Sequence, residues 1–394
     1  MSLLSVAEAQ ARILALAPVL ATEMVPLAAA AGRWAIEPIE ANRTQPAADL
    51  SAMDGYAIRF GELPGPWTLA EGESTPGTAA ATPLKPGQAL RIFTGAPLPP
   101  EADTILVQED AAREGERLRL SGDGPPRRHA HVRPLGSDFR SGDRLIEAGE
   151  RLTPARIGLA AVGGHGVLQV RRRPRIALIS TGDELVPPGT PTHGVQLPSS
   201  NAPMLAALLA ALPVEIEDLG IVRDDLDAIA TAFAGARADI IVTTGGASVG
   251  DHDLVRPALE RAGASLDFWR AAMKPGKPIM GGRLGDATVL GLPGNPVSAF
   301  VTATLFLLPL IRSALGAAAP IPAPRLVPLG GTVAATDKRA EYLRARIADG
   351  RAFPLSGQDS AALAMLAEAQ ALIVRPPYAP ARDEGETVEI LDIA

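Results

Sequence analysis

The stretch Asp239-Ile-Ile-Val-Thr-Thr-Gly-Gly-Ala-Ser-Val-Gly-Asp-His-Asp253 decides the fold of this chain. An apolar, β-branched run ends in a glycine-rich loop, and a helical pattern follows at 254–261. The same alternation of strand and helix extends from Arg175 to a long helix that begins near Val297. It predicts a doubly wound α/β domain, in which a parallel sheet carries helices on both faces.

Polar loops follow each of the predicted strands. The strands are expected at 175–180, 215–219, 239–244 and 288–292, and the loops at 180–184, 220–225, 243–253 and 292–298. In a doubly wound sheet such loops emerge at the carboxyl edge, where ligands bind at the switch in strand order. We therefore expect the four loops to share one crevice.

The glycine-rich loop has the composition of an anion site. Its small residues let the backbone approach a ligand and aim amide N–H groups at it: Gly245, Gly246, Ser248 and Gly250. The spacing matches neither a Walker A loop nor a dinucleotide fingerprint. Nearby carboxylates would supply oxygen ligands for a bridging Mg²⁺: Asp224, Asp225, Asp251 and Asp253. A turn without a ligand, and carboxylates that only cap helices, are the open alternatives.

Lysine is scarce in this arginine-rich chain. Of only four lysines, Lys274 and Lys277 both lie in Met273-Lys-Pro-Gly-Lys-Pro278. Compact ammonium charges on a proline-stiffened loop suit a tetrahedral oxyanion or a phosphate. The alternative is a solvated lysine turn.

A second stiff loop, Leu292-Pro-Gly-Asn-Pro296, precedes the long apolar helix. Pro293 and Pro296 fix φ on both sides of a glycine, so the loop amides are held in place. Ser298 follows at the helix start and would face the same edge. A purely structural turn is the alternative here.

The remaining chain divides by composition. Two predicted helices begin after Ser5 and Thr153, and between them a stretch dense in Gly, Pro and short β-prone runs indicates a β-rich insert. A proline-rich linker near 319 precedes short alternating strands. We therefore predict an elongated domain (1–42 and 137–174), a β-rich insert (43–136), the α/β domain (175–318) and a C-terminal β domain (319–394).

Composition also excludes several classes of function. With 394 residues and a formal net charge of −7, the chain lacks the basic face that nucleic-acid binding requires. It has no cysteine, so any metal is held by oxygen or nitrogen. The N-terminus lacks the basic leader of a secretory signal, and the apolar segment 297–311 is shorter than the ~20 residues of a membrane span. We expect a cytoplasmic protein without a membrane span.

Eight motifs, in order along the chain, resemble those of the molybdopterin molybdenumtransferases. They are SAMDGYA (51–57), RIFTGAPLP (91–99), RPLGSD (133–138), STGDEL (180–185), RDD (223–225), TTGGASVGDHD (243–253), MKPGKP (273–278) and GLPGNPVS (291–298). The similarity continues through EYLRARI (341–347) to Ser360, so it covers essentially the whole chain. The resemblance implies an elongated homodimer, with the active site between the α/β domain of one subunit and the inserted lobe of the other.

The resemblance also implies a reaction. Molybdate and adenylylated molybdopterin are the substrates, and AMP leaves with the help of Mg²⁺. The glycine loop then binds the adenylyl phosphates, and Asp224, Asp251 and Asp253 serve the metal. The residues implied for molybdate and cofactor binding are Lys274, Lys277, Asn295, Ser298, Arg344 and Ser360, with Pro293 and Pro296 shaping the wall. Acidic or hydroxyl positions that the family uses are matched by Asp54, Thr94, Asp138 and Glu184.

Two rival functions belong to other classes. One is a molybdopterin adenylyltransferase, a single α/β domain with a related glycine loop, against which the inserted lobe argues. The other is a non-catalytic dimeric scaffold, against which the lack of an added domain argues. The resemblance also allows partners among other cofactor-biosynthesis proteins and molybdoenzyme chaperones. Molybdenum and tungsten are not distinguished, because both form tetrahedral dianions.

Overall fold

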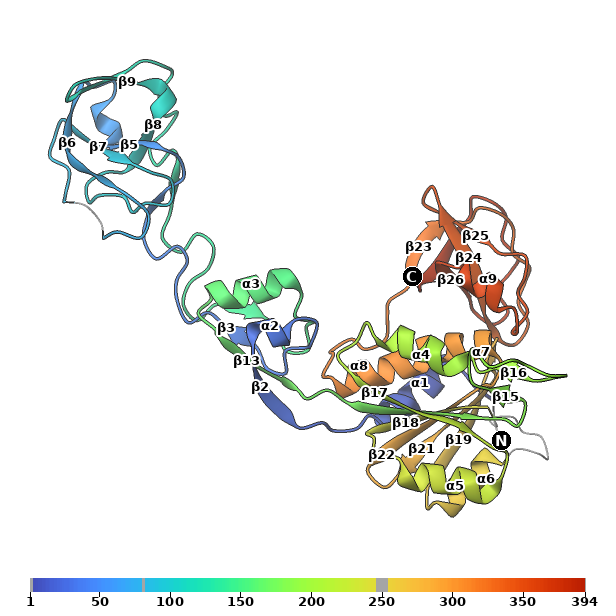
Figure 1. Cartoon of the computed structure of the whole chain (residues 1–394). Helices are drawn as coiled ribbons and strands as arrows, with labels where there is room; N and C mark the ends of the chain where they lie inside the picture. Colours follow the sequence, from blue (N-terminus) through green and yellow to red (C-terminus); the bar gives the residue numbers. More distant parts are fainter. Residues whose placement is uncertain (1–2, 80–81, 246–253, 394) are drawn as a thin grey trace.

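The computed structural model describes residues 3–79, 82–245 and 254–393, without the side chains of 267–269. Figure 1 shows an elongated molecule in which a β-rich lobe lies at one end and a layered α/β part with a C-terminal β sheet lies at the other. A thin segment of short helices and strands joins the two ends. The chain is therefore a multidomain α/β protein.

The α/β part is built on a seven-stranded sheet in the order β1-β19-β21-β22-β18-β14-β17. Its strands are β1 (Leu3–Leu4), β14 (Arg175–Thr181), β17 (Glu215–Val222), β18 (Ile240–Thr244), β19 (Ser265–Ala271), β21 (Pro278–Leu284) and β22 (Ala287–Leu292). The neighbours β17, β14, β18 and β22 run parallel, and every residue of β18 is buried. These four strands confirm the predicted ones.

The sheet is mixed rather than purely parallel, which corrects the prediction. β21 runs antiparallel to both β19 and β22, and neither β19 nor β21 is among the predicted strands. Gly281 and Gly282 weaken the strand signal of β21, because glycine has no side chain to pack. A Cβ on Gly282 would lie 2.4 Å from the Ser265 carbonyl oxygen, so β19 leaves no room for one. The two-residue Gly285-Asp286 turn was the available hairpin signal.

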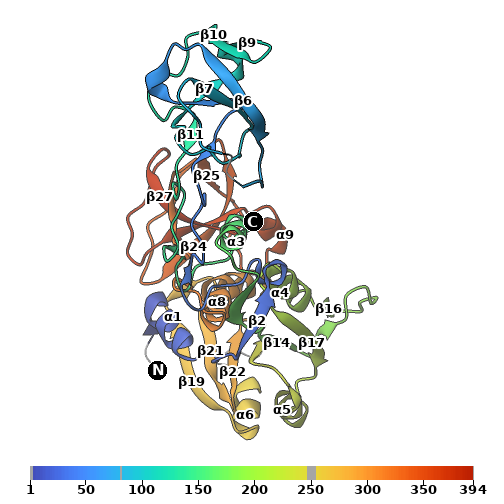
Figure 2. The ribbon, with the colours of Figure 1, turned by 90° about the vertical axis from the view of Figure 1, so that its left-hand side faces the viewer.

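Helices cover both faces of this sheet (Figures 1 and 2). One face carries α1 (Val6–Ala15), α4 (Asn201–Leu209), α7 (Pro296–Thr302) and α8 (Leu308–Ala314), and the other carries α5 (Leu226–Gly235) and α6 (Val255–Arg261). The π-helical turn Ala303–Leu307 joins α7 and α8 into one helix of 19 residues, longer than the predicted apolar segment. Among the described residues this helix alone is long and apolar enough to cross a membrane, but 78% of its apolar window is buried in the protein. It is the central helix of the core.

The first residues pack on the α/β part. β1 pairs with β19, and Ile13 of α1 lies in the same core as α8. The predicted capping box is confirmed, because the Ser5 amide donates to Glu8 Oε2 at 2.8 Å and the Glu8 amide donates to Ser5 Oγ at 3.2 Å. The buried side of α1 therefore faces the long core helix, and the grouping of 1–42 in the elongated domain stays a prediction.

The connecting segment is a ribbon of β2 (Thr22–Pro26) and antiparallel β13 (Val167–Arg171). It also contains α2 (Leu27–Ala30), β3 (Ile39–Glu40), β12 (Arg144–Ile146) and α3 (Pro154–Val162). The predicted cap of α3 is confirmed: the Thr153 hydroxyl accepts from the Arg156 amide at 3.4 Å, and Pro154 occupies the first turn.

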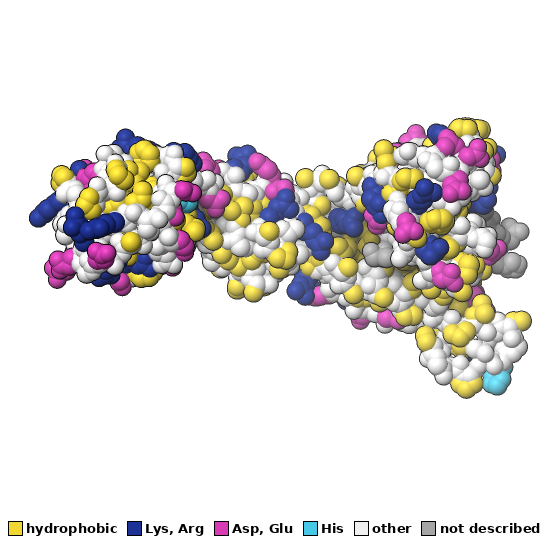
Figure 3. Space-filling model, turned by 90° about the horizontal axis from the view of Figure 1, so that it is seen from above, with side chains coloured by type: hydrophobic (Ala, Val, Ile, Leu, Met, Phe, Trp, Pro, Cys, Tyr) yellow, Lys and Arg dark blue, Asp and Glu magenta, His cyan; other side chains and the backbone are white. Residues whose placement is uncertain are grey.

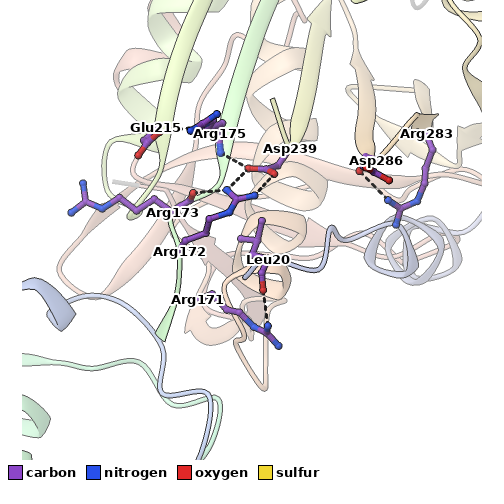
Figure 4. Close-up of polar contacts among 9 residues, drawn as sticks. All are labelled: Leu20, Arg171, Arg172, Arg173, Arg175, Glu215, Asp239, Arg283 and Asp286. Atoms are coloured by element: carbon purple, nitrogen blue, oxygen red, sulfur yellow. Dashed lines mark hydrogen bonds and ion pairs between the residues drawn. The ribbon is translucent and has the colours of Figure 1, made fainter. Parts of the chain in front are cut away.

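An ion-pair cluster ties this ribbon to the sheet (Figure 4). Asp239 accepts from both terminal nitrogens of Arg172, at 2.7 and 2.6 Å, and from the Arg175 amide at 2.8 Å. Beside it, Arg171 donates to the Leu20 carbonyl at 2.6 Å. Burial disfavours the Asp239 carboxylate, but the hydrogen bonds from Arg172 and Arg175 outweigh this and hold its pKa below the usual range. The cluster fixes the ribbon against the start of β14.

The inserted lobe holds a six-stranded sheet in the order β8-β5-β7-β6-β10-β9. Its strands are β5 (Gly55–Ile58), β6 (Trp67–Ser74), β7 (Gln88–Ile92), β8 (Thr104–Val107), β9 (Ala111–Glu114) and β10 (Arg117–Leu120), and the short β4 (Leu50–Ser51) pairs with β11 (Val132–Arg133). Figure 3 shows Lys and Arg side chains interspersed with Asp and Glu on the visible face of this lobe and of the C-terminal sheet.

The C-terminal sheet runs in the order β20-β24-β26-β27-β23, and β25 pairs with β24. Its elements are β20 (Met273–Lys274), β23 (Arg325–Pro328), β24 (Ala340–Ala348), β25 (Arg351–Pro354), β26 (Ala371–Arg375) and β27 (Thr387–Asp392), with the helix α9 (Leu363–Ala367). Figures 1 and 2 place this sheet over the face that carries α4 and α7. Because β20 comes from the α/β part, the predicted lysine loop lies where the two sheets meet.

Candidate active site

A cavity of about 860 Å³ opens at the carboxyl ends of β14 and β17. The loops after both strands and the start of α4 line it, with Ser180, Asp183, Ser199, Arg223 and Asp224 among the polar side chains. This is the edge at which a doubly wound sheet binds its ligands. The predicted meeting of the loops 180–184 and 220–225 is confirmed.

Two carboxylates from these loops are held together. The Asp183 amide donates to Asp224 Oδ2 at 3.4 Å, and the Asp224 amide donates to Asp183 Oδ1 at 3.2 Å. Asp225 instead accepts from the Ala228 amide at 2.8 Å and caps α5, so the capping alternative holds for Asp225. Asp183 is not among the predicted site residues, although it lies inside the STGDEL motif.

The glycine turn after β18 touches the loops on both sides. Gly245 has φ of +95°, and a Cβ there would lie 2.4 Å from the Thr181 carbonyl oxygen. A Cβ on Gly294 would lie 3.5 Å from the Gly245 Cα, and the Gly294 carbonyl accepts from Asn201 Nδ2 at 2.7 Å. The loops after β14, β18 and β22 thus lie against one another, and the approach of Gly245 to Thr181 leaves no room for a side chain at position 245.

The loop after β22 also meets the C-terminal domain. Asn295 Nδ2 donates to Ser360 Oγ at 2.9 Å, and the Val297 amide donates to the Ser360 carbonyl at 3.2 Å. Pro296 occupies the first turn of α7, where its missing N–H costs nothing, and Ser298 is buried in the same turn. Residues of the predicted molybdate pocket from two domains are therefore neighbours.

The lysine loop packs on α7. Gly276 has φ of +101°, and a Cβ there would lie 2.5 Å from Thr302 Cγ2 and 3.6 Å from the Ser298 carbonyl oxygen. Lys274 Nζ lies 3.3 Å from Glu341 Oε1, its partner in the β20–β24 pairing. Sequence reasoning missed Glu341, because its partner is 67 positions away along the chain.

Arg344 on β24 is a buried cation, with 1% of its surface exposed. One amino group donates to the Gly357 carbonyl, and Gln358 bonds both the amide and the carbonyl of Arg344. Its Nε has no hydrogen-bond partner among the described residues. Burial lowers the pKa of Arg344, and Asp359 acts in the opposite direction. A guanidinium keeps its charge at neutral pH, so Arg344 places a buried positive charge in the C-terminal sheet.

Other predicted residues lie away from this edge. In the inserted lobe the Thr94 amide and hydroxyl both donate to Asp54 Oδ1 at 2.7 Å, and these two bonds lower the pKa of Asp54. The Asp138 amide donates to the Gln45 carbonyl in the stem below the lobe. Figure 1 shows the lobe and the α/β part at opposite ends of the molecule, so one chain does not join these residues to the cavity.

Glu184 lies at the cavity loop but folds back on it. Its Oε2 is 2.5 Å from the point where a Cβ on Gly182 would lie. The remaining predicted residues fall outside the described part of the chain: Gly246, Ser248, Gly250, Asp251 and Asp253. Among the described residues there is no group of three or more His, Cys, Asp or Glu that could hold a metal ion.

This geometry defines a multidomain α/β protein that brings acidic loops, a glycine turn and both buried and exposed cations together at one sheet edge, as sites for anionic ligands do. Comparisons with family models narrow the class. Residues 4–164 match the MoeA N-terminal region (domain I and II), residues 177–313 match the probable molybdopterin binding domain, and residues 327–393 match the MoeA C-terminal region (domain IV).

Relatives and solved structures agree with these matches. The molybdopterin molybdenumtransferase of Haemophilus influenzae is 37% identical over 304 residues, which are 75% of this chain and 73% of that protein. The one from Synechococcus elongatus is 34% identical over 389 residues, 94% of each chain. The crystal structure of a molybdopterin biosynthesis MoeA protein from Pyrococcus horikoshii covers 100% of both chains with a TM-score of 0.81 and 28% identity. The chain belongs to the molybdopterin molybdenumtransferase family.

Proposed function

We propose that this chain inserts molybdenum from molybdate into adenylylated molybdopterin and releases AMP, the final step of molybdenum cofactor biosynthesis. One observation carries the proposal: loops of two domains touch in an unbroken series, from Thr181 through Gly245 and Gly294 to Asn295 and Ser360. A reaction that joins an oxyanion to a phosphorylated pterin requires two anion sites side by side. Family membership supports the same activity.

In this proposal the oxyanion lies between the lysine loop and the C-terminal domain. The residues that receive it are Lys274, Lys277, Ser298, Arg344 and Ser360. The buried Arg344 Nε without a partner supports a charged ligand, because an unmet buried donor costs about 1–3 kcal/mol. Asn295 orients the Ser360 hydroxyl, and Pro293 and Pro296 hold the wall rigid.

The adenylyl phosphates lie on the other side of Gly294. The glycine loop would bind them through its amides, with Gly245, Gly246, Ser248 and Gly250 as the small residues. Asp224, Asp251 and Asp253 would hold Mg²⁺, and the neighbouring Asp183 adds a carboxylate at the same cavity. Carboxylate oxygens are the donors that Mg²⁺ prefers, so the donor set fits the ion. Bound Mg²⁺ would neutralise phosphate charge as AMP leaves.

We further propose a cytoplasmic homodimer in which the inserted lobe of a second copy completes the cleft. The half-buried Asp54 and the exposed Thr94 are preorganised by their mutual hydrogen bonds but lie far from the cavity of their own chain. The finer fold description belongs to this proposal: a doubly wound α/β domain, a β-rich insert, an elongated dimerising domain bearing Asp138, and a C-terminal β domain. Glu184 would lie at the rim of the cleft, and other cofactor-biosynthesis proteins or molybdoenzyme chaperones would receive the product.

The test uses purified full-length protein with adenylylated molybdopterin, molybdate and Mg²⁺. We expect AMP release that depends on molybdate, together with a product that activates a cofactor-free molybdoenzyme. Asp253→Asn should abolish both while leaving the circular dichroism spectrum unchanged; near-normal turnover would remove Asp253 from the mechanism. Incubation with unmodified molybdopterin and ATP is the counter-test, because adenylylation of the pterin would overturn the proposal.

A further inference from the structure

A second cavity, of about 230 Å³, lies where the α/β sheet meets the C-terminal sheet. Its lining residues, here called the basic pocket, are Leu3, Arg270, Lys277, Asp337, Lys338 and Arg339. Four cations and one carboxylate give it a formal charge of +3, in a chain whose formal net charge is −7. A concentration of charge opposite to that of the whole protein creates a local potential that attracts anions.

The backbone around the basic pocket is rigid. The Ala271 amide donates to the Lys277 carbonyl at 3.1 Å, and the Ala272 amide donates to the Leu4 carbonyl at 2.7 Å. The Ala340 amide then donates to the Ala272 carbonyl at 2.8 Å. All four chain segments that contribute lining residues are thus tied together at two adjacent alanines, so the backbone positions that carry the charges are fixed relative to one another before any ligand binds.

Most of the positive charge in the basic pocket is uncompensated. Asp337 is used by Arg339, whose amide and Nη2 donate to it at 2.9 and 3.3 Å. Within the described ranges of the chain, Arg270, Lys277 and Lys338 form no ion pair and no side-chain hydrogen bond. Three unpaired cations that share one cavity repel one another, and an anion would relieve this repulsion.

The distribution of lysine strengthens this point. Lys274, Lys277 and Lys338 are three of the four lysines in the whole chain, and all three gather here, since Lys274 is near enough to help lower the pKa of Asp337. The remaining one, Lys85, lies in the inserted lobe. At about 30 Å³ per water molecule, the cavity has room for a tetrahedral oxyanion with part of its hydration shell but is too small for a pterin nucleotide.

We propose that the basic pocket is an oxyanion capture subsite. It holds a tetrahedral dianion beside Lys277, from which the ion passes to the pocket of Lys274, Ser298 and Arg344. The identity of this dianion as molybdate rests on the proposed function, whereas the affinity of the pocket for a tetrahedral dianion does not.

Equilibrium dialysis with molybdate alone tests the subsite, without pterin or Mg²⁺. We expect the wild type to bind two molybdate ions per chain with different affinities. At low salt the ion of lower affinity should be lost in Lys338→Glu and bound about fivefold more weakly in Lys338→Gln. Lys85→Gln is the matched control, because it removes one exposed lysine far from the cavity and should still bind two ions with unchanged affinity. One ion per chain in the wild type, or Lys338→Gln identical to Lys85→Gln, would overturn the inference.

Competition and turnover decide the role of the subsite. If AMP displaces the more weakly bound molybdate ion as effectively as inorganic phosphate does, the pocket recognises phosphate esters. The capture role is then refuted. In turnover, Lys338→Gln should lower kcat/KM for molybdate about fivefold with kcat unchanged at saturation, and 0.5 M salt should abolish the difference. Binding of two molybdate ions per chain without any cofactor formation would refute the proposed function alone. Normal turnover with only one molybdate ion per chain, whose affinity the Lys338 substitutions leave unchanged, would refute the subsite alone.

Discussion

We expect the replacement of Arg344 by Met to separate oxyanion binding from folding in this protein. The substitution keeps a long unbranched side chain on β24 but removes the guanidinium. In the structure Arg344 is 1% exposed, its guanidinium donates to the Gly357 carbonyl, and its Nε has no partner in the described part of the chain. If an oxyanion is its missing partner, the loss should appear in oxyanion affinity far more than in stability.

The magnitudes follow from the contacts of Arg344. A hydrogen bond from a charged group contributes about 1.5–3 kcal/mol, and leaving a buried donor unmet costs about 1–3 kcal/mol. The methionine variant loses the hydrogen bond to Gly357 but also removes the penalty of the unmet Nε donor, and the two effects largely cancel. Its unfolding free energy should therefore change by less than about 1.5 kcal/mol, as for other buried charges replaced by apolar groups of similar volume. The variant also lacks the charge-assisted contact that Arg344 would make to the bound dianion. The loss of this contact corresponds to a rise of about 10- to 100-fold in KM for molybdate.

The assay compares Arg344→Met with Arg346→Met, which makes the same change two residues along the same strand. Arg346 is exposed and stacks on Phe353, 5.6 Å from the ring centroid. Urea unfolding and KM for molybdate are measured for both variants. The reasoning is refuted if Arg344→Met binds molybdate like the wild type, or if it unfolds at a urea concentration that indicates a loss of stability above about 1.5 kcal/mol.

Two further substitutions test the junction and the glycine turn. Asp239→Asn should lower the free energy of unfolding by only about 1–2 kcal/mol at pH 7, because Arg172 is partly exposed. Since the pKa of Asp239 is depressed in the folded protein, the stability advantage of the wild type should fade as the pH falls below about 4. Equal urea midpoints of the two proteins at pH 7 would contradict this. Gly245→Ala should stop AMP release in a protein that still folds, because alanine in a left-handed backbone conformation costs about 1–2 kcal/mol and the new Cβ would clash with Thr181. The control is Gly235→Ala, whose added Cβ would meet open space. AMP release by both variants would show that the turn at Gly245 tolerates a side chain.

Local patterns in the sequence were sufficient for the elements that depend on nearest neighbours. The Ser5 cap, the four parallel strands and the polar loops at their carboxyl ends depend on short-range periodicity and side-chain chemistry, so they could be predicted. The order of motifs along the chain indicated the family in the same way. Antiparallel β19 and β21 were not predicted. Gly281 and Gly282 weaken the strand signal of β21, and the Gly285-Asp286 turn indicates its hairpin with β22 but not its pairing with β19.

Tertiary structure alone decided which distant charges meet. Nothing local to Lys274 indicates Glu341 as its partner, nothing around Arg344 indicates that its guanidinium is buried, and nothing near Lys338 places it with Arg270. These pairs depend on the register of β20 against β24, which long-range backbone hydrogen bonds set. Sequence spacing carries the chemistry that each residue offers, but the field that an anion experiences depends on distances in space, and only the folded chain supplies those.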